Sequence, residues 1–272
     1  RQGRDYKNEE SVIRSRTSGG FRIVNHPNRK KPLFPYTSWL DADGVEVWNT
    51  ILENSPFLRF NINRSNNRDA FLQWKNALKT GKRYSALAGS DFHFSIPCLK
   101  ERTLIYPVNH IPGVDKENTR EHLFKGRSSF LTRPTAPKLT LNAKFKSAND
   151  WAEMGDNIKG SGIVQAELFG DFSDTNKRIG GVCYNVVNKF YKLLTFWKKR
   201  RWEIRFYNWE NEVIAKRQMN PKWYSYKKHF KATIEFPTEG NEIIRAELWS
   251  INKRSKSVDL LGATNPVYIN WK

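Results

Sequence analysis

The sequence has little cysteine, no long apolar run and no apolar leader. Only two cysteines, Cys98 and Cys183, occur among 272 residues, and neither belongs to a Cys-x-x-Cys pair. This argues against a disulfide scaffold and against a structural zinc site, so we interpret both as packed thiols. No stretch approaches the roughly 18 apolar residues of a membrane-spanning helix. We therefore expect no membrane span.

The amino terminus lacks the features of a secretory signal. Residues 1–16 are polar and charged, and the chain begins at Arg1 rather than at a methionine. We interpret this first residue as a truncation or processing point, so the missing signal leaves the compartment open. The oligomeric state is also left open.

What the sequence has in excess is positive charge. The formal net charge is +20, and the basic residues are spread over both halves of the chain. Such a field attracts polyanions, among them nucleic acid, although much of it also suits a solvated surface. The densest basic cluster, Lys198–Arg201, lies between Trp197 and Trp202. Such a cluster is typical either of a surface that binds a phosphate backbone or of a sheet edge where lysines prevent aggregation.

The pattern of elements changes near residue 135. Before it, short apolar strands alternate with helices predicted at 68–79 and 118–125, which favours an α/β class. After it, strands dominate and suggest an antiparallel sandwich; they are predicted at 138–145, 162–169, 202–209, 213–217, 229–236, 242–250 and 266–271. A helix is predicted at 185–197. We expect two domains, 1–135 and a β-rich accessory domain at 136–272.

Three side chains follow apolar strands and carry metal-binding chemistry. His26 follows the strand that ends at Val24, whereas Asp91 and His93 follow the strand that ends at Ala88. Ligands collect at the carboxyl ends of strands in α/β sheets and barrels. Imidazole and carboxylate together suit zinc, manganese or iron. We therefore expect a divalent metal site formed by these three residues.

An ordered set of segments resembles a known family. The set is Gly19–Pro27, Gly44–Asn49, a helix with Trp74, Gly81–Tyr84, Gly89–His93, Gly126–Thr132 and Thr264–Ile269. It resembles the second half of a PHP (polymerase and histidinol phosphatase) domain, in the carbaryl-hydrolase-like branch. The resemblance covers residues 1–135 best and the remainder loosely.

The resemblance implies the C-terminal part of a distorted (β/α) barrel with two or three metal ions. His26 matches the isolated histidine ligand of the family, and Asp91 and His93 match its last ligand pair. The implied chemistry is hydrolysis of a phosphoester, an ester or a carbamate by metal-activated water. Because the His-x-His pair of the family is absent, we expect a fragment of low activity; a decayed paralogue retained for partner contacts is the alternative.

Three further residues are candidates for contact with a small anionic or ester substrate. Asn49 ends the strand at 44–49, and Arg83 and Arg127 carry the guanidinium group that matches phosphate geometry. Each has a plainer alternative, a turn-bonding Asn or a surface charge. The second functional hypothesis is a non-enzymatic basic module that binds polyanions such as nucleic acid.

Overall fold

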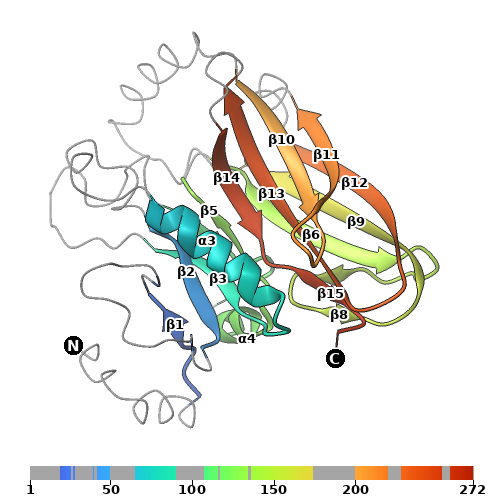
Figure 1. The fold of residues 1–272 in the computed structure, drawn as a ribbon, viewed down its shortest axis with the longest axis horizontal. Helices are drawn as coiled ribbons and strands as arrows, with labels where there is room; N and C mark the ends of the chain where they lie inside the picture. Colours follow the sequence, from blue (N-terminus) through green and yellow to red (C-terminus); the bar gives the residue numbers. More distant parts are fainter. Residues whose placement is uncertain are drawn as a thin grey trace, which may run out of the picture.

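Strands dominate the computed structural model (Figure 1). They make up about 53% of the described residues, and helices about 12%. None of the described helices is long and apolar enough to cross a membrane. The structure describes residues 19–25, 27, 39, 42–49, 65–89, 107–115, 117–133, 136–173, 200–219, 228–252 and 258–271. The helix predicted at 185–197 lies outside these ranges.

The amino-terminal part holds a three-stranded parallel sheet and a helix. The strands β1 (Ile23–Val24), β2 (Gly44–Asn49) and β3 (Ser85–Gly89) pair in that order. The helix α3 (Ser65–Leu78) connects β2 to β3. It buries Phe71, Trp74 and Leu78 at helical spacing, and the chain turns at Gly81 with a φ of 87°.

The largest sheet has eight strands. Its main order is β11 (Val213–Met219), β10 (Arg200–Tyr207), β13 (Glu242–Asn252), β14 (Val258–Thr264), β5 (Ser129–Leu131) and β4 (Val108–His110). These strands pair antiparallel. Two short strands, β15 (Val267–Ile269) and β8 (Asn157–Ile158), extend it beside β13. The helix α4 (Thr119–Lys125) lies between β4 and β5 in the chain.

A four-stranded antiparallel sheet packs against one face of this large sheet. Its order is β12 (His229–Thr238), β9 (Gly162–Asp171), β6 (Lys138–Phe145) and β7 (Ala152–Glu153). Along β6 every second side chain is fully enclosed, as the alternating sequence predicts. The apolar side chains of β6, β9 and β12 form one core with those of β10 and β13. An antiparallel sandwich therefore fits this part of the molecule.

A second core lies on the other face of the large sheet. It joins apolar residues of β2 and α3, such as Val47 and Trp74, to Phe130, Ile243 and Trp271 of the antiparallel part. Strands from both sides of residue 135 thus share one sheet, because β4 and β5 pair with β14. The domain boundary placed at that residue stays a prediction.

The α/β fold class expected from the sequence is wrong. A distorted (β/α) barrel requires parallel strands that alternate with helices. The described residues contain two helices, and only β1, β2 and β3 form a parallel sheet among themselves. The next strands, β4 and β5, pair antiparallel and continue into the large sheet. The strand–helix–strand pattern of the first 89 residues was real, but it does not propagate into a barrel.

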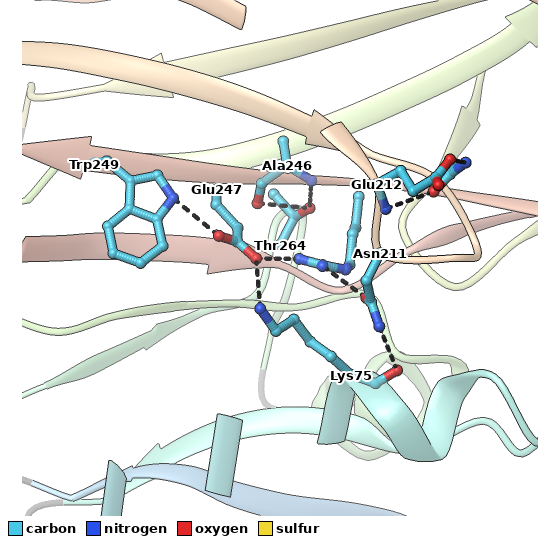
Figure 2. A network of polar contacts seen from close by, with 9 residues as sticks. Lys75, Asn211, Glu212, Ala246, Glu247, Trp249 and Thr264 are labelled. Atoms are coloured by element: carbon cyan, nitrogen blue, oxygen red, sulfur yellow. Dashed lines mark hydrogen bonds and ion pairs between the residues drawn. The ribbon is translucent and has the colours of Figure 1, made fainter. Parts of the chain in front are cut away.

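A buried ionic network fastens α3 to the large sheet (Figure 2). Arg245 and Glu247, both on β13 and fully buried, form an ion pair. The Glu247 carboxylate also accepts a hydrogen bond from Trp249 Nε1 at 2.9 Å and lies 3.8 Å from Lys75 Nζ of α3. Arg245 Nη2 donates to Asn211 Oδ1 at 2.9 Å. Burial lowers the pKa of Lys75, because desolvation disfavours the charged amine. The negative charge of Glu247 acts in the opposite direction and favours the charged form.

Asparagine side chains close the outer edge of the parallel sheet. The side-chain oxygen of Asn265 accepts a hydrogen bond from the N–H of Ala86 at 2.7 Å. Its side-chain nitrogen donates a hydrogen bond to the carbonyl of Ala86 at 3.4 Å. The carboxamide of Asn109, on β4, accepts a hydrogen bond from the N–H of Ala88 and donates one to its carbonyl, both at 2.8 Å. Each carboxamide thus supplies one donor and one acceptor, as a backbone neighbour would. The edge strand β3 is thereby joined to the large sheet without a continuous ladder.

Candidate anion-binding pocket

The three residues predicted to bind metal lie outside the described residues. These are His26, Asp91 and His93. Within the described ranges, no group of three or more His, Cys, Asp or Glu side chains is placed to hold a metal ion. The divalent cofactor expected from the sequence therefore stays a prediction.

Asn49 lies at the junction of β2 and α3, where it is buried. Its backbone N–H donates to Asn67 Oδ1 at 2.9 Å, and its carbonyl accepts from Asn67 Nδ2 at 2.8 Å. Its own carboxamide donates to Glu46 Oε1 at 3.2 Å. Asn67 thus ties β2 to the first turn of α3. The substrate contact predicted for Asn49 stays a prediction.

Arg83, one of the three residues predicted to contact substrate, lines a small pocket and has an exposed side chain. It lies in the turn between α3 and β3 and is exposed. Its guanidinium lies over the Tyr268 ring, with the Cζ atom 4.3 Å from the ring centroid. Within the described part of the chain, Arg83 forms no ion pair. Burial raises the pKa of Tyr268, so the ring below the cation stays neutral.

The C-terminal end of α4 forms part of the pocket lining through Phe124, Lys125 and Gly126. Gly126 takes the left-handed conformation, with a φ of 76°, and ends the helix directly after Lys125. The carbonyl of Leu123 accepts from the Gly126 N–H and from Ser85 Oγ, both at 3.0 Å. The carbonyl of His122 accepts from the Arg127 N–H at 2.8 Å. These bonds satisfy carbonyls that would otherwise lack partners at the helix end.

Arg127 holds the neighbouring turn rather than facing the pocket as a lone charge. Its Nη2 donates to Asp156 Oδ1 at 2.8 Å, and its Nε lies 3.7 Å from Glu153 Oε2. The hydrogen bond that it donates to Asp156 raises the pKa of this guanidinium. The turn that it holds contains Gly155, where an added Cβ would lie 1.7 Å from the Lys125 carbonyl oxygen. Only glycine permits this close approach, which shapes the pocket wall. The substrate-binding role predicted for Arg127 is untested.

The pocket is small. Its enclosed cavity volume is about 10 Å³, which is close to the minimum that one water molecule needs. It is lined by Arg83, Tyr84, Ser85, Phe124, Lys125, Gly126, Gly155, Asn265, Pro266 and Tyr268. Asn265 and Tyr268, two of these lining residues, are almost completely buried. Arg83 and Lys125 are the basic residues of the lining.

Sequence reasoning named Arg83, whose contact with substrate stays a prediction, and did not name its pocket neighbours Lys125, Ser85 and Tyr268. A signal for Lys125 was present, because a helix predicted to end before Gly126 places Lys125 in its last turn. Nothing local indicates that Tyr268 lies under Arg83, since 185 residues separate them in the chain. This contact depends on the placement of β15 beside β13 and β8.

Comparisons with known proteins gave only distant structural likenesses. No family model matches the chain, and no curated protein matches it. The PmoD soluble domain from Methylocystis sp. ATCC 49242 (Rockwell) is 11% identical, covers 49% of this chain and 91% of its own, and has a TM-score of 0.26.

Two further solved structures have similarly low sequence identities and TM-scores. The CARDB domain of the PF1109 protein from Pyrococcus furiosus, in complex with di-metal ions, is 15% identical, covers 49% of this chain and 89% of its own, and has a TM-score of 0.25. The C-terminal domain of wzt is 5% identical, covers 52% of this chain and 72% of its own, and has a TM-score of 0.24. At these scores none of the three supports an argument about function.

The resemblance to a PHP-type metallohydrolase is wrong. A PHP barrel requires parallel strands, whereas β4 and β5 pair antiparallel with each other and with β14. The described part of the chain is mostly antiparallel sheet and contains no group of side chains placed to hold a metal ion. Short segments such as Gly44–Asn49 match the family motif because any buried strand before a turn has such a composition. Their order along the chain was not sufficient to identify the family.

Proposed function

We propose that the chain is a non-enzymatic module that binds polyanions, with nucleic acid as the ligand. The observation that carries the proposal is the net charge of +20 together with the accessible cations Arg83 and Lys125 at one pocket. Lysine and arginine that neutralise phosphates release condensed counterions, and this release drives binding.

The described carboxylates support this proposal because many are already neutralised within the fold. Ion pairs join Glu203 to Arg205, Glu167 to Lys231, Glu235 to Lys146, Asp156 to Arg127 and Glu210 to Lys79. Acidic groups that are paired in this way leave little negative surface to repel a polyanion.

Most of the excess basic residues belong to segments outside the described ranges. Lys198–Lys199 and Lys253–Arg254 are among them. The described end of the first cluster, Arg201, lies on β10, which pairs with β11 on one side and β13 on the other. The sheet edge is instead β11, which carries the exposed Lys216 and Arg217. At Arg201 the strand pairs with Ile251 of β13, whereas its register with β11 begins at Trp202. The explanation of Lys198–Arg201 as edge protection therefore stays a prediction.

The test is fluorescence anisotropy with a labelled single-stranded oligonucleotide over a series of salt concentrations. We expect binding at low salt that weakens linearly in a log–log plot, with a slope of about −0.7 per phosphate neutralised. The double variant Arg83→Gln/Lys125→Gln should lower this slope by roughly 1.4, because two phosphate contacts are lost. Lys216→Gln/Arg217→Gln, with the same loss of charge on the edge strand β11, is the matched control and should change it less. Absence of binding at low salt, or binding that salt does not weaken, would contradict the proposal.

Metal-dependent hydrolysis has lost the support of the family resemblance. Its three expected ligands lie outside the described residues, so the structure neither brings them together nor separates them. Catalytic activity of the chain stays a prediction from sequence.

A further inference from the structure

We infer that the edge of β11 binds an extended acidic segment of a partner protein as an added strand. The inference goes beyond nucleic-acid binding, because it concerns another surface and another class of partner. It rests on the position of β11 in the large sheet and on the charges that this strand carries.

β11 is the last strand of the large sheet on one side. Among the described strands it pairs with β10 alone. Its seven residues contain neither glycine nor proline, and the register irregularity of the pair lies near one end, between Phe206 and Tyr207 of β10. The edge of such a strand offers backbone N–H and C=O groups with which a further strand can pair.

The centre of this edge carries two cations. Lys216 and Arg217 are exposed, and neither forms an ion pair within the described part of the chain. Arg217 Nη1 donates to the Lys216 carbonyl at 3.2 Å, so the guanidinium lies against the backbone of β11. The residue opposite Lys216 on β10 is a third cation, Arg205, whose partner is Glu203. The charge of the edge itself is therefore positive and not compensated by these neighbours.

The same charges disfavour a second copy of the chain as the added strand. Lys216 is the middle residue of Val213–Met219, so full antiparallel overlap of two copies places it opposite itself. Like charges that lie directly opposite each other destabilise a pair of strands. Lysine on an edge strand commonly prevents such self-association. An edge that is protected from its own copies in this way still accepts a strand of opposite charge.

An acidic strand matches both cations at once. Successive side chains of a strand point to opposite faces, so Lys216 and Arg217 lie on the two faces of the sheet. Two adjacent carboxylates in the added strand would each meet one of these cations. Glu212, the acidic residue just before β11, bonds to Asn208 and lies outside the strand. Backbone hydrogen bonds then supply affinity, and the two charge pairs select the partner and its register.

The test is fluorescence anisotropy with a labelled peptide of alternating Thr and Val that carries two adjacent Glu at its centre. We expect it to bind about tenfold more tightly than the same peptide with two Lys, because two opposite-charge pairs replace two like-charge pairs. Lys216→Glu/Arg217→Glu should reverse this order. Circular dichroism checks that the variant is folded.

Two methylated forms of the Glu peptide test the backbone ladder. In an antiparallel pair every second residue turns its N–H toward the neighbouring strand. Methylation of alternate backbone nitrogens therefore removes either the donors that face β11 or those that face away from it. We expect one methylated form to lose binding and the other to keep most of it.

The outcomes separate this inference from its rivals and from the proposed function. Equal affinity for the Glu and Lys peptides, or no binding of the Glu peptide, overturns it. Equal affinity of the two methylated forms also overturns it, because attraction between charges alone then explains the binding. A wild-type dimer that Lys216→Glu/Arg217→Glu dissociates in the analytical ultracentrifuge would assign the edge to a second copy instead. The oligonucleotide assay contains no peptide, so the proposed function and this inference can each fail while the other stands.

Discussion

At the scale of single residues, the buried pair Arg245 and Glu247 makes the fold sensitive to small changes. Both side chains are fully buried, so neither can be solvated if its partner is removed. Lys75 and Trp249 depend on the same carboxylate. A buried ion pair is weak evidence for stability, but breaking one is costly.

We expect Glu247→Gln to lower the free energy of unfolding by about 3–5 kcal/mol, because Arg245 is left buried beside a neutral amide. The double variant Arg245→Met/Glu247→Leu should be destabilised less than this single variant, since no charge remains buried. Glu210→Gln, which removes the exposed partner of Lys79, is the control and should cost about 1 kcal/mol or less. Urea unfolding followed by tryptophan fluorescence measures all three. A loss of the same size in Glu247→Gln and Glu210→Gln would contradict the prediction.

At the scale of elements, side-chain amides take the place of a missing strand. Asn265 and Asn109 bond to Ala86 and Ala88 on the outer edge of β3. The first amide is almost completely buried and also donates to Ser128 Oγ at 2.8 Å, whereas the second lies in an exposed environment. The two bridges have the same pattern of bonds but different access to water.

We expect Asn265→Asp to destabilise the protein by about 2–4 kcal/mol, because a carboxylate would lie buried against the carbonyl of Ala86. Asn109→Asp makes the same chemical change where water reaches the group, and it should cost about 1 kcal/mol or less. Thermal unfolding at neutral pH compares them. Lowering the pH should restore part of the stability of Asn265→Asp by protonating the new acid, and an effect as large at residue 109 as at residue 265 would refute the argument from burial.

Much of the secondary structure could be predicted from the sequence, but its assembly could not. The alternation of apolar residues gave the strand at 138–145 with both ends correct, and the apolar spacing around Trp74 gave α3. Strands of two or three residues, such as β7 and β8, are too short for a period to appear. Alternation also carries no information on partners, so nothing in β5 indicates that it pairs with β14 rather than with β3. The same limit hid Tyr268 from the predicted site.

At the scale of the whole molecule, alkaline pH should weaken the fold through its buried phenols. Burial raises the pKa of Tyr207 from 10.0 to about 12, and burial also raises the pKa of Tyr268. Below pH 10 both the folded and the unfolded chain keep these protons, so the stabilisation is fully present. Above it the unfolded chain loses them first and stability falls. The lowered pKa of Lys75 acts in the opposite direction, since its penalty is relieved as the pH rises.

We expect the urea midpoint of the wild type to fall between about pH 10 and pH 12. Tyr207→Phe has no proton to lose at this position, so its midpoint should fall less over the same interval. Absorbance of the phenolate in the folded protein gives an independent reading of the titration. Identical pH profiles of the wild type and Tyr207→Phe would show that this phenol does not contribute.

The two amide bridges differ also in how they age. Deamidation begins when the backbone nitrogen of the next residue attacks the side-chain carbonyl, and it converts the amide into an acid. Asn265 is followed by Pro266, which has no N–H to start this reaction, whereas Asn109 is followed by His110. The buried bridge is therefore protected by its neighbour in the chain, and slow chemical damage is directed to the bridge that the fold can lose at least cost.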